Sequence, residues 1–154
     1  MIYLASKSPR RAELLKKINV EFLLLEAEIE ENLVLEGSPA FNAEKLAKEK
    51  CSQGIKNAIA TNLENYPVLA ADTIVVMGNK IYGKPKSSDH AFTMLLELSG
   101  QVHEVITGVS VGAWDSEKVD IATISVSTFV EFGDISAIEL KEYSETDEPL
   151  DKAG

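Results

Sequence analysis

Hydrophobic residues along the chain form two kinds of segment, short continuous runs and stretches with helical spacing. Continuous runs predict buried strands, because a strand covered on both faces is apolar at successive positions. Such runs occupy residues 1–5, 21–27 and 66–77, and longer strand patterns occupy 101–114 and 118–132. The segments with helical spacing follow serine-based N-cap signals, and helices are expected over 9–18, from 39 to 54 or beyond, from 87 or 88 to near 100, and from 136 to about 143.

Local details predict how these elements connect and pack. The Gly-Asn pair at 78–79 suits a two-residue hairpin turn, after which 80–82 returns as a strand. The first helix is expected to face the core through Leu14, Leu15 and Ile18. Because strands and helices interleave while several strands pair as hairpins, we expect an α/β fold with a mixed sheet.

Composition and charge narrow the class of protein. The 154 residues suit one domain, and 45% hydrophobic residues are enough for a core. No apolar run approaches the roughly 20 residues of a membrane span, and the apolar N-terminus has no basic region typical of a secretory signal. A single cysteine excludes an internal disulfide framework. A net charge of −10 argues against binding to a nucleic-acid polymer but leaves room for a small anion in a local basic pocket. The cytoplasm is the expected location.

Asp72 departs most clearly from its surroundings. It lies in the apolar run 68–76, where a carboxylate costs several kcal/mol unless it is paired or bound to a metal ion. An exposed strand position or a structural salt bridge is one interpretation. A catalytic or metal-binding carboxylate is the other, and the pattern favours it.

Basic residues break the pattern in two helices. Lys50 falls on the apolar stripe of the second helix, where it either faces an anion or lies at the stripe's edge with its amine in water. Ser8 precedes the first helix, whose free backbone N–H groups can bind an anion. Arg10 and Arg11 lie in its first turn, where the helix dipole disfavours cations. A bound phosphate would resolve that conflict, although for the pair by itself two solvated surface arginines are the better explanation.

Three further features are weak by themselves. Lys84 lies just past the predicted hairpin, in a Gly-Lys-Pro segment. An acidic cluster after the second strand is typical of a solvated surface, but one carboxylate could help to hold a divalent ion; its members are Glu28, Glu30 and Glu31. His103 lies in a strand pattern and fits a structural histidine better than a metal ligand.

Short motifs follow one another over residues 4–154. In sequence order they are 4–11 (LASKSPRR), 13–15 (ELL), 29–31 (IEE), 46–50 (LAKEK), 71–75 (ADTIV), 83–85 (GKP), 98–105 (LSGQVHEV), 107–109 (TGV) and 147–154 (DEPLDKAG). Together they resemble the Maf family of nucleoside triphosphate pyrophosphatases. The family normally continues for some tens of residues past the last motif, including a glutamine that reads the base. We therefore expect a single Maf-like domain over 1–154 that is truncated at its C-terminus.

The resemblance implies a reaction and a fold. Maf proteins hydrolyse a nucleoside triphosphate to the monophosphate and pyrophosphate with a divalent metal, Mg²⁺ or Mn²⁺. Their fold is the two-lobed α/β type of inosine triphosphate pyrophosphatases, a twisted mixed sheet flanked by helices with a cleft between the lobes. By motif match, Asp72 is the general base, Glu31 and Asp72 are the metal-side carboxylates, and the phosphate contacts are Ser8, Arg10, Arg11, Lys50 and Lys84.

Two positions imply the substrate. Arg10 and Thr73 match the branch of the family that acts on dTTP and UTP, whereas the 7-methyl-GTP branch has Trp and Gln there. The resemblance therefore implies a house-cleaning dTTP/UTP pyrophosphatase whose partner is a nucleoside triphosphate, and homodimers are common in the family. The alternative is a nucleotide-binding regulator of septum formation and cell division with little turnover. A purine-directed enzyme of the inosine triphosphate type is a third interpretation.

Overall fold

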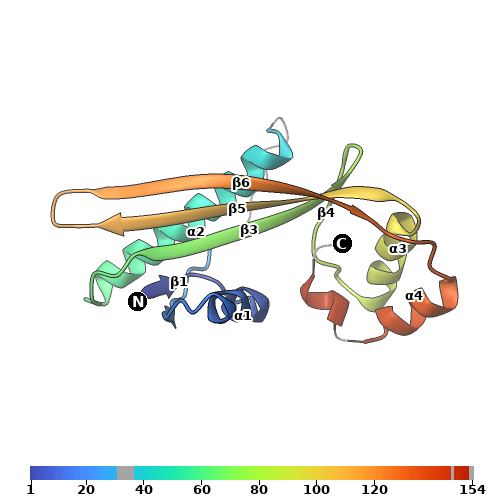
Figure 1. The fold of residues 1–154 in the computed structure, drawn as a ribbon, viewed down its shortest axis with the longest axis horizontal. Helices are drawn as coiled ribbons and strands as arrows, with labels where there is room; N and C mark the ends of the chain where they lie inside the picture. The colour runs from blue at the N-terminus through green and yellow to red at the C-terminus, as the bar shows by residue number, and fades with distance from the viewer. Residues whose placement is uncertain (31–36, 147, 153–154) are drawn as a thin grey trace. The chain divides into compact units, whose positions relative to one another are not determined.

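The computed structural model describes residues 1–30, 37–146 and 148–152. Strands and helices alternate along most of the chain (Figure 1). The elements are β1 (Ile2–Leu4), α1 (Pro9–Lys17), β2 (Phe22–Leu24), α2 (Pro39–Ala60), β3 (Val68–Met77), β4 (Lys80–Tyr82), α3 (Ser88–Leu98), β5 (Val102–Trp114), β6 (Val119–Glu131), α4 (Ala137–Ser144) and the 3₁₀ helix η1 (Glu148–Asp151). The predicted α/β class is confirmed.

The strands form one mixed sheet of six, in the order β2-β1-β3-β5-β6, with β4 paired to β3. β1 runs parallel to both β2 and β3, whereas β4 returns antiparallel to β3. The predicted hairpin at 78–79 is present, and Gly78 has φ of 58°, in the left-handed region that glycine favours. This topology gives the mixed sheet that the hairpin signals predicted.

The chain divides into two compact units, each with its own core. The first comprises Met1–Asp72 and Thr107–Ser125, and the second comprises Thr73–Ile106 and Val126–Gly154. In the first unit, α2 packs on the sheet through a core of Tyr3, Ala5, Cys51, Ile55, Val68 and Ala70. In the second, α3 packs on β3 and β4 through Val75, Tyr82, Met94 and Leu98.

The N-caps were predicted well because capping is a local signal. Ser38, Ser87 and Ser136 each accept a backbone N–H from the first turn of their helix, and Ser136 forms a full capping box with Glu139. Ser8 occupies the N-cap position of α1, but its side chain makes no capping hydrogen bond. The cap of α1 is built differently, as the site below shows.

Two expectations near the N-terminus were wrong. The strand expected over 21–27 is shorter, since only Phe22–Leu24 pair with β1. Leu15 is the one buried residue of α1, whereas Leu14 and Ile18 are exposed. The inward stripe of α1 passes through Arg11 and Leu15, four residues apart, which turns Leu14 to the side. Ile18 is the C-cap residue, so helical spacing no longer orients it.

Candidate active site

The central feature of the site is an ion pair between β3 and α2. Strand alternation places Val68, Ala70 and Asp72 on one face of β3. This face packs against α2, where Cys51 Sγ donates to the carbonyl oxygen of Val68 at 3.4 Å. One residue earlier on α2, Lys50 Nζ lies 2.5 Å from Asp72 Oδ1. The structure thus brings together the two residues that broke the apolar pattern.

Asp72 is buried and Lys50 is nearly so, with side-chain exposures of 11% and 15%. A carboxylate in this environment needs a cation, and Lys50 supplies it from the inward stripe of α2. The pattern left open whether the Lys50 amine stays in water, and the structure shows that it reaches Asp72 instead. The pair places a carboxylate and an ammonium group side by side in a largely buried position.

The N-terminus of α1 is tied to β3 immediately before Asp72. The Nη1 group of Arg11 donates to the carbonyl oxygen of Ala71 at 2.8 Å and to Ser6 Oγ at 3.2 Å. Ser6 Oγ also accepts the backbone N–H of Ser8 at 3.2 Å. Ser6 therefore replaces Ser8 in organising the start of the helix, and Arg11 links that start to β3.

Ser6 was not among the site residues predicted from the sequence, although the sequence contains a signal for its role. A serine two residues before an N-cap commonly forms a turn by accepting a backbone N–H. The contact with Ala71 had no such signal, because its acceptor is a backbone carbonyl 60 residues away in sequence.

The remaining predicted residues lie at different places in the two units. Arg10 is exposed in the first turn of α1, in the first unit with Ser8, Arg11, Lys50 and Asp72. Thr73 follows Asp72 on β3, is half-buried, and begins the second unit. Lys84 is exposed in the loop after β4, also in the second unit. Glu31 lies outside the described residues.

Glu28, in the acidic segment after β2, pairs with a lysine of the loop after β1. The carboxylate of Glu28 accepts a hydrogen bond from Lys7 Nζ on the protein surface. This hydrogen bond lowers the pKa of Glu28 and raises that of Lys7. Within the residues that the structure describes, no three Asp, Glu, His or Cys side chains gather closely enough to hold a metal ion.

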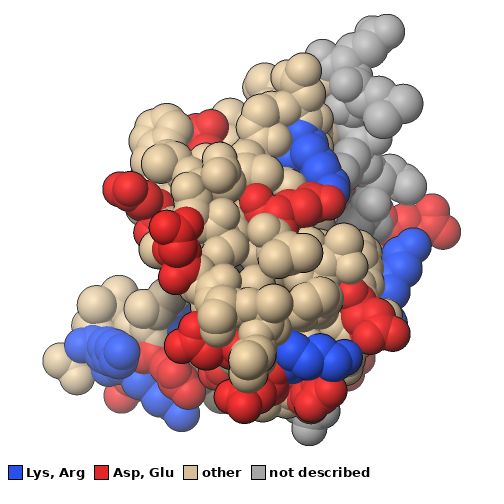
Figure 2. All heavy atoms as spheres, turned by 90° about the vertical axis from the view of Figure 1, so that its right-hand side faces the viewer, with Lys and Arg blue, Asp and Glu red and all other residues tan. Residues whose placement is uncertain are grey.

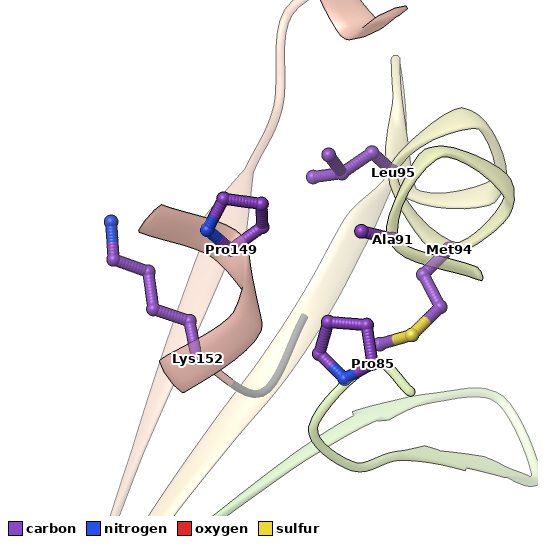
Figure 3. Close-up of a pocket in the computed structure, with 6 residues that line it drawn as sticks. All are labelled: Pro85, Ala91, Met94, Leu95, Pro149 and Lys152. Carbon is purple, nitrogen blue, oxygen red and sulfur yellow. The ribbon is translucent and has the colours of Figure 1, made fainter. Parts of the chain in front are cut away.

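A small hollow in the second unit joins two of the sequence motifs (Figure 3). It has a cavity volume of about 10 Å³, and its lining residues are Pro85, Ala91, Met94, Leu95, Pro149 and Lys152. The Lys152 ammonium is held by Tyr143 Oη at 3.1 Å and by Glu148 at 3.2 Å. The hollow has room for about one water molecule. It is therefore a packing feature that joins the segment after Lys84 to η1.

Two buried groups that can react or titrate have structural surroundings. Cys51 is fully buried, and burial raises the pKa of its thiol to about 11. His103 is buried with its ring edge-on to Phe132 at a centroid distance of 4.7 Å, and burial lowers the pKa of its imidazole. A thiol with a raised pKa is a poor nucleophile, and an imidazole packed on an aromatic ring fits the structural role predicted for His103.

Charge on the surface is mixed. On the face drawn in Figure 2, the Lys and Arg side chains that the structure describes form small separate groups among Asp and Glu. A nucleic-acid polymer is bound by a continuous basic surface, which this face does not present over its described part. Across the described chain, none of the helices has the length and hydropathy needed to cross a membrane.

Comparison of the sequence with known proteins identifies its family. The family described as Maf-like protein matches residues 1–154. The chain belongs to the Maf family. A dTTP/UTP pyrophosphatase of Pseudoalteromonas atlantica is 42% identical over 154 residues, which is 100% of this chain and 78% of the relative. The resemblance inferred from the motifs is thereby confirmed.

Other Maf relatives carry the same name. A dTTP/UTP pyrophosphatase of Nitrosospira multiformis is 40% identical over 161 residues, covering 99% of this chain and 76% of its own length. A dTTP/UTP pyrophosphatase of Saccharophagus degradans is 43% identical over 153 residues, which is 99% of this chain and 70% of the relative. The match to named Maf pyrophosphatases therefore extends over nearly the whole chain rather than over isolated motifs.

Proposed function

We propose that this Maf protein hydrolyses nucleoside triphosphates, with dTTP and UTP as substrates, to the monophosphate and pyrophosphate. The observation that carries the proposal is the buried Asp72 on β3, paired with Lys50 at 2.5 Å. Support comes from relatives of about 40% identity that are named dTTP/UTP pyrophosphatases. None of the comparisons favours the alternative of a regulator with little turnover.

In the proposed reaction, Asp72 is the general base. A water molecule gives its proton to the Asp72 carboxylate and attacks phosphorus, the α–β phosphoanhydride breaks, and pyrophosphate leaves with the electron pair of the broken bond. Lys50 lies at the same carboxylate, so its ammonium is near the charge that develops on the phosphate oxygens. A positioned general base contributes typically about 10²–10⁴-fold to the rate.

The remaining cations are assigned to binding. Arg10 and Ser8 lie at the start of α1, where helix N–H groups favour an anion. Arg11 bonds the Ala71 carbonyl and so joins this anion-binding end to the strand that carries Asp72. Lys84 is assigned a phosphate contact by its motif.

A divalent cation, Mg²⁺ or Mn²⁺, is proposed as the cofactor. Magnesium usually takes one or two carboxylates, with phosphate oxygens and water completing its shell. Asp72 is proposed as one carboxylate ligand, which fits that small donor set, and Glu31 is proposed as the second. When bound, the cation would neutralise charge on the triphosphate oxygens. The proton acceptor would still be Asp72, and its counter-charge would still be Lys50.

A nucleotide panel tests the function. The protein is incubated with dTTP, UTP, CTP, ITP, XTP and 7-methyl-GTP in the presence of Mg²⁺ or Mn²⁺, and released pyrophosphate is measured. We expect turnover of dTTP and UTP above the others, and Asp72→Asn should lower kcat at least about 10²-fold while the circular dichroism spectrum is retained. Tight binding without pyrophosphate release would support the regulator instead, and preference for ITP or XTP would support a purine-directed enzyme.

Two properties are proposed on the family resemblance alone. We expect a homodimer, which light scattering coupled to gel filtration would detect as twice the mass of 16.8 kDa. A monomer at all concentrations tested would contradict that expectation. The cytoplasm is proposed as the location, and fractionation of cells that produce the protein would test it.

A further inference from the structure

The loop that carries Lys84 is fixed at its start and in its middle. It connects β4 to α3 over residues 83–87. At its start, Tyr82 Oη donates to Glu97 Oε2 of α3 at 2.8 Å. In its middle, Pro85 lines the hollow with side chains of α3 (Figure 3). The last residues of the loop are held instead by contacts with the start of α3.

His90 holds the end of this loop. The N-cap of α3 is Ser87, whose Oγ accepts the backbone N–H of His90 at 3.2 Å. The imidazole returns toward the loop, and its Nδ1 accepts the backbone N–H of Lys86 at 3.1 Å. In an ordinary capping box the side chain at this helical position accepts the N–H of the N-cap residue, whereas the imidazole of His90 accepts the N–H of the residue before the N-cap. Helix α4 shows the ordinary form, with Glu139 bonded to Ser136.

We infer that His90 is a positioning residue for Lys84. The inference rests on the proposed function, in which Lys84 contacts the triphosphate. Two peptide units separate Lys84 from Lys86, so the hydrogen bond at Lys86 restricts the path of the backbone that presents the Lys84 side chain. Loss of this hydrogen bond frees that backbone, and a freed side chain binds phosphate with a larger loss of conformational entropy. Nucleotide affinity therefore falls while the chemical step is unaffected.

The hydrogen bond requires a lone pair on the ring nitrogen. The Nδ1 atom of His90 uses that lone pair to accept the hydrogen bond from the backbone N–H of Lys86.

The charged groups on α3 and on the elements packed against it form ion pairs with one another. Two of the pairs join an acid of α3 to a lysine of a neighbouring element, and the third lies at η1. The pairs are Asp89 with Lys141 of α4, Glu97 with Lys80 of β4, and Glu148 with Lys152 within the η1 segment. The His90 ring contacts the loop through the hydrogen bond from Lys86.

Removal of the acceptor tests this role. His90→Ala removes the Nδ1 atom that accepts the N–H of Lys86. Thr93→Ala is the matched control, because it removes an exposed hydrogen bond within α3, from Thr93 Oγ1 to the Asp89 carbonyl, without touching the loop. The measurements are KM and kcat for pyrophosphate release from UTP at pH 8, and the Lys86 amide signal in ¹H–¹⁵N spectra.

We expect His90→Ala to raise KM about two- to tenfold at pH 8 with little change in kcat, the scale of one exposed hydrogen bond. Thr93→Ala should match the wild type. The Lys86 amide signal should shift in His90→Ala and keep its wild-type position in Thr93→Ala.

Lys84→Ala separates failure of this inference from failure of the proposed function. If Lys84 contacts the nucleotide, Lys84→Ala raises KM, and adding His90→Ala changes it little further. An equal additional rise in the double variant would overturn the positioning role, as would a Lys86 amide that is insensitive to His90. An unchanged KM in Lys84→Ala would instead overturn the phosphate contact on which the inference rests, and the Lys86 amide would show whether the hydrogen bond exists. Absence of any pyrophosphate release from the wild type would refute the proposed function itself.

Discussion

Removal of both partners of the Lys50–Asp72 ion pair should cost less stability than the sum of the two single removals. The charged atoms are 2.5 Å apart, and the side chains are 15% and 11% exposed. At that distance an effective dielectric constant of 20 gives an attraction of about 7 kcal/mol. Desolvation of each ion costs several kcal/mol, which offsets most of that attraction. The pair therefore contributes far less net stability than the attraction alone, although each charge depends on the other.

Lys50→Met should accordingly lower the free energy of unfolding by about 3 kcal/mol, since it leaves the Asp72 carboxylate buried without its cation. Asp72→Asn should cost about 2 kcal/mol, because the Lys50 amine can move toward solvent on its flexible stem. The double variant should cost about 2 kcal/mol less than the sum of the two single variants, because residues in direct contact have coupled effects on stability. Urea unfolding followed by far-UV circular dichroism measures all three.

The exposed pair of Lys118 and Asp120 provides a matched control. Its charged atoms are also 2.5 Å apart, but the side chains are 66% and 68% exposed. Lys118→Met should therefore change the free energy of unfolding by less than about 1 kcal/mol. If Lys50→Met were no more costly than Lys118→Met, or if the Lys50 and Asp72 effects were additive, the assignment of a buried, mutually dependent pair would be refuted.

Three further predictions follow from single positions. Gly108→Ala should destabilise the protein by more than about 2 kcal/mol in urea unfolding, because a Cβ there would lie 2.3 Å from the Ala43 carbonyl oxygen; a loss below 0.5 kcal/mol (roughly the effect of a surface change) would contradict the packing. Burial lowers the pKa of His103, so the unfolded chain takes up the proton first and stability should fall as the pH drops below about 6.5, by up to about 1.4 kcal/mol per pH unit. His103→Phe should show less of this fall, and identical pH profiles would rule out His103 as its source. Arg10→Trp with Thr73→Gln should shift the nucleotide panel toward 7-methyl-GTP, and an unchanged pyrimidine preference would place specificity elsewhere.

Much of the fold was predictable because its signals are local. Serine caps and a Gly-Asn turn each act within four residues, and the structure places them where the pattern predicted. The inward position of Lys50 was predictable for the same reason, since helical spacing alone put it on the stripe with Leu46 and Ala47. Asp72 was identified because a carboxylate conflicts with an apolar run.

What escaped prediction depends on contacts between distant segments. The guanidinium of Arg11 bonds a backbone carbonyl, and every residue offers one, so no residue type marks Ala71 as the acceptor. The buried side of α1 was misjudged at Leu14 and Ile18, because their apolar side chains suggested burial, whereas Leu15 is the buried residue and shares its face with Arg11. A cation on a buried stripe is counted as polar by any hydropathy pattern, although its hydrogen bonds satisfy it there.

Small residues on β5 explain how α2 comes close enough to β3 for its lysine to reach the carboxylate. Gly108 lies against Ala43 and Gly112 lies against Cys51. These two residues of α2 are about two helical turns apart. A Cβ at either glycine would come within 2.8 Å of those atoms, so any larger side chain would push α2 away from the sheet. Lys50 precedes Cys51 and would move with it, which would lengthen an ion pair whose strength falls with distance. The Thr-Gly-Val motif at 107–109 thus includes a glycine whose contacts are with α2, and part of its value to the site is the depth at which α2 presents its lysine.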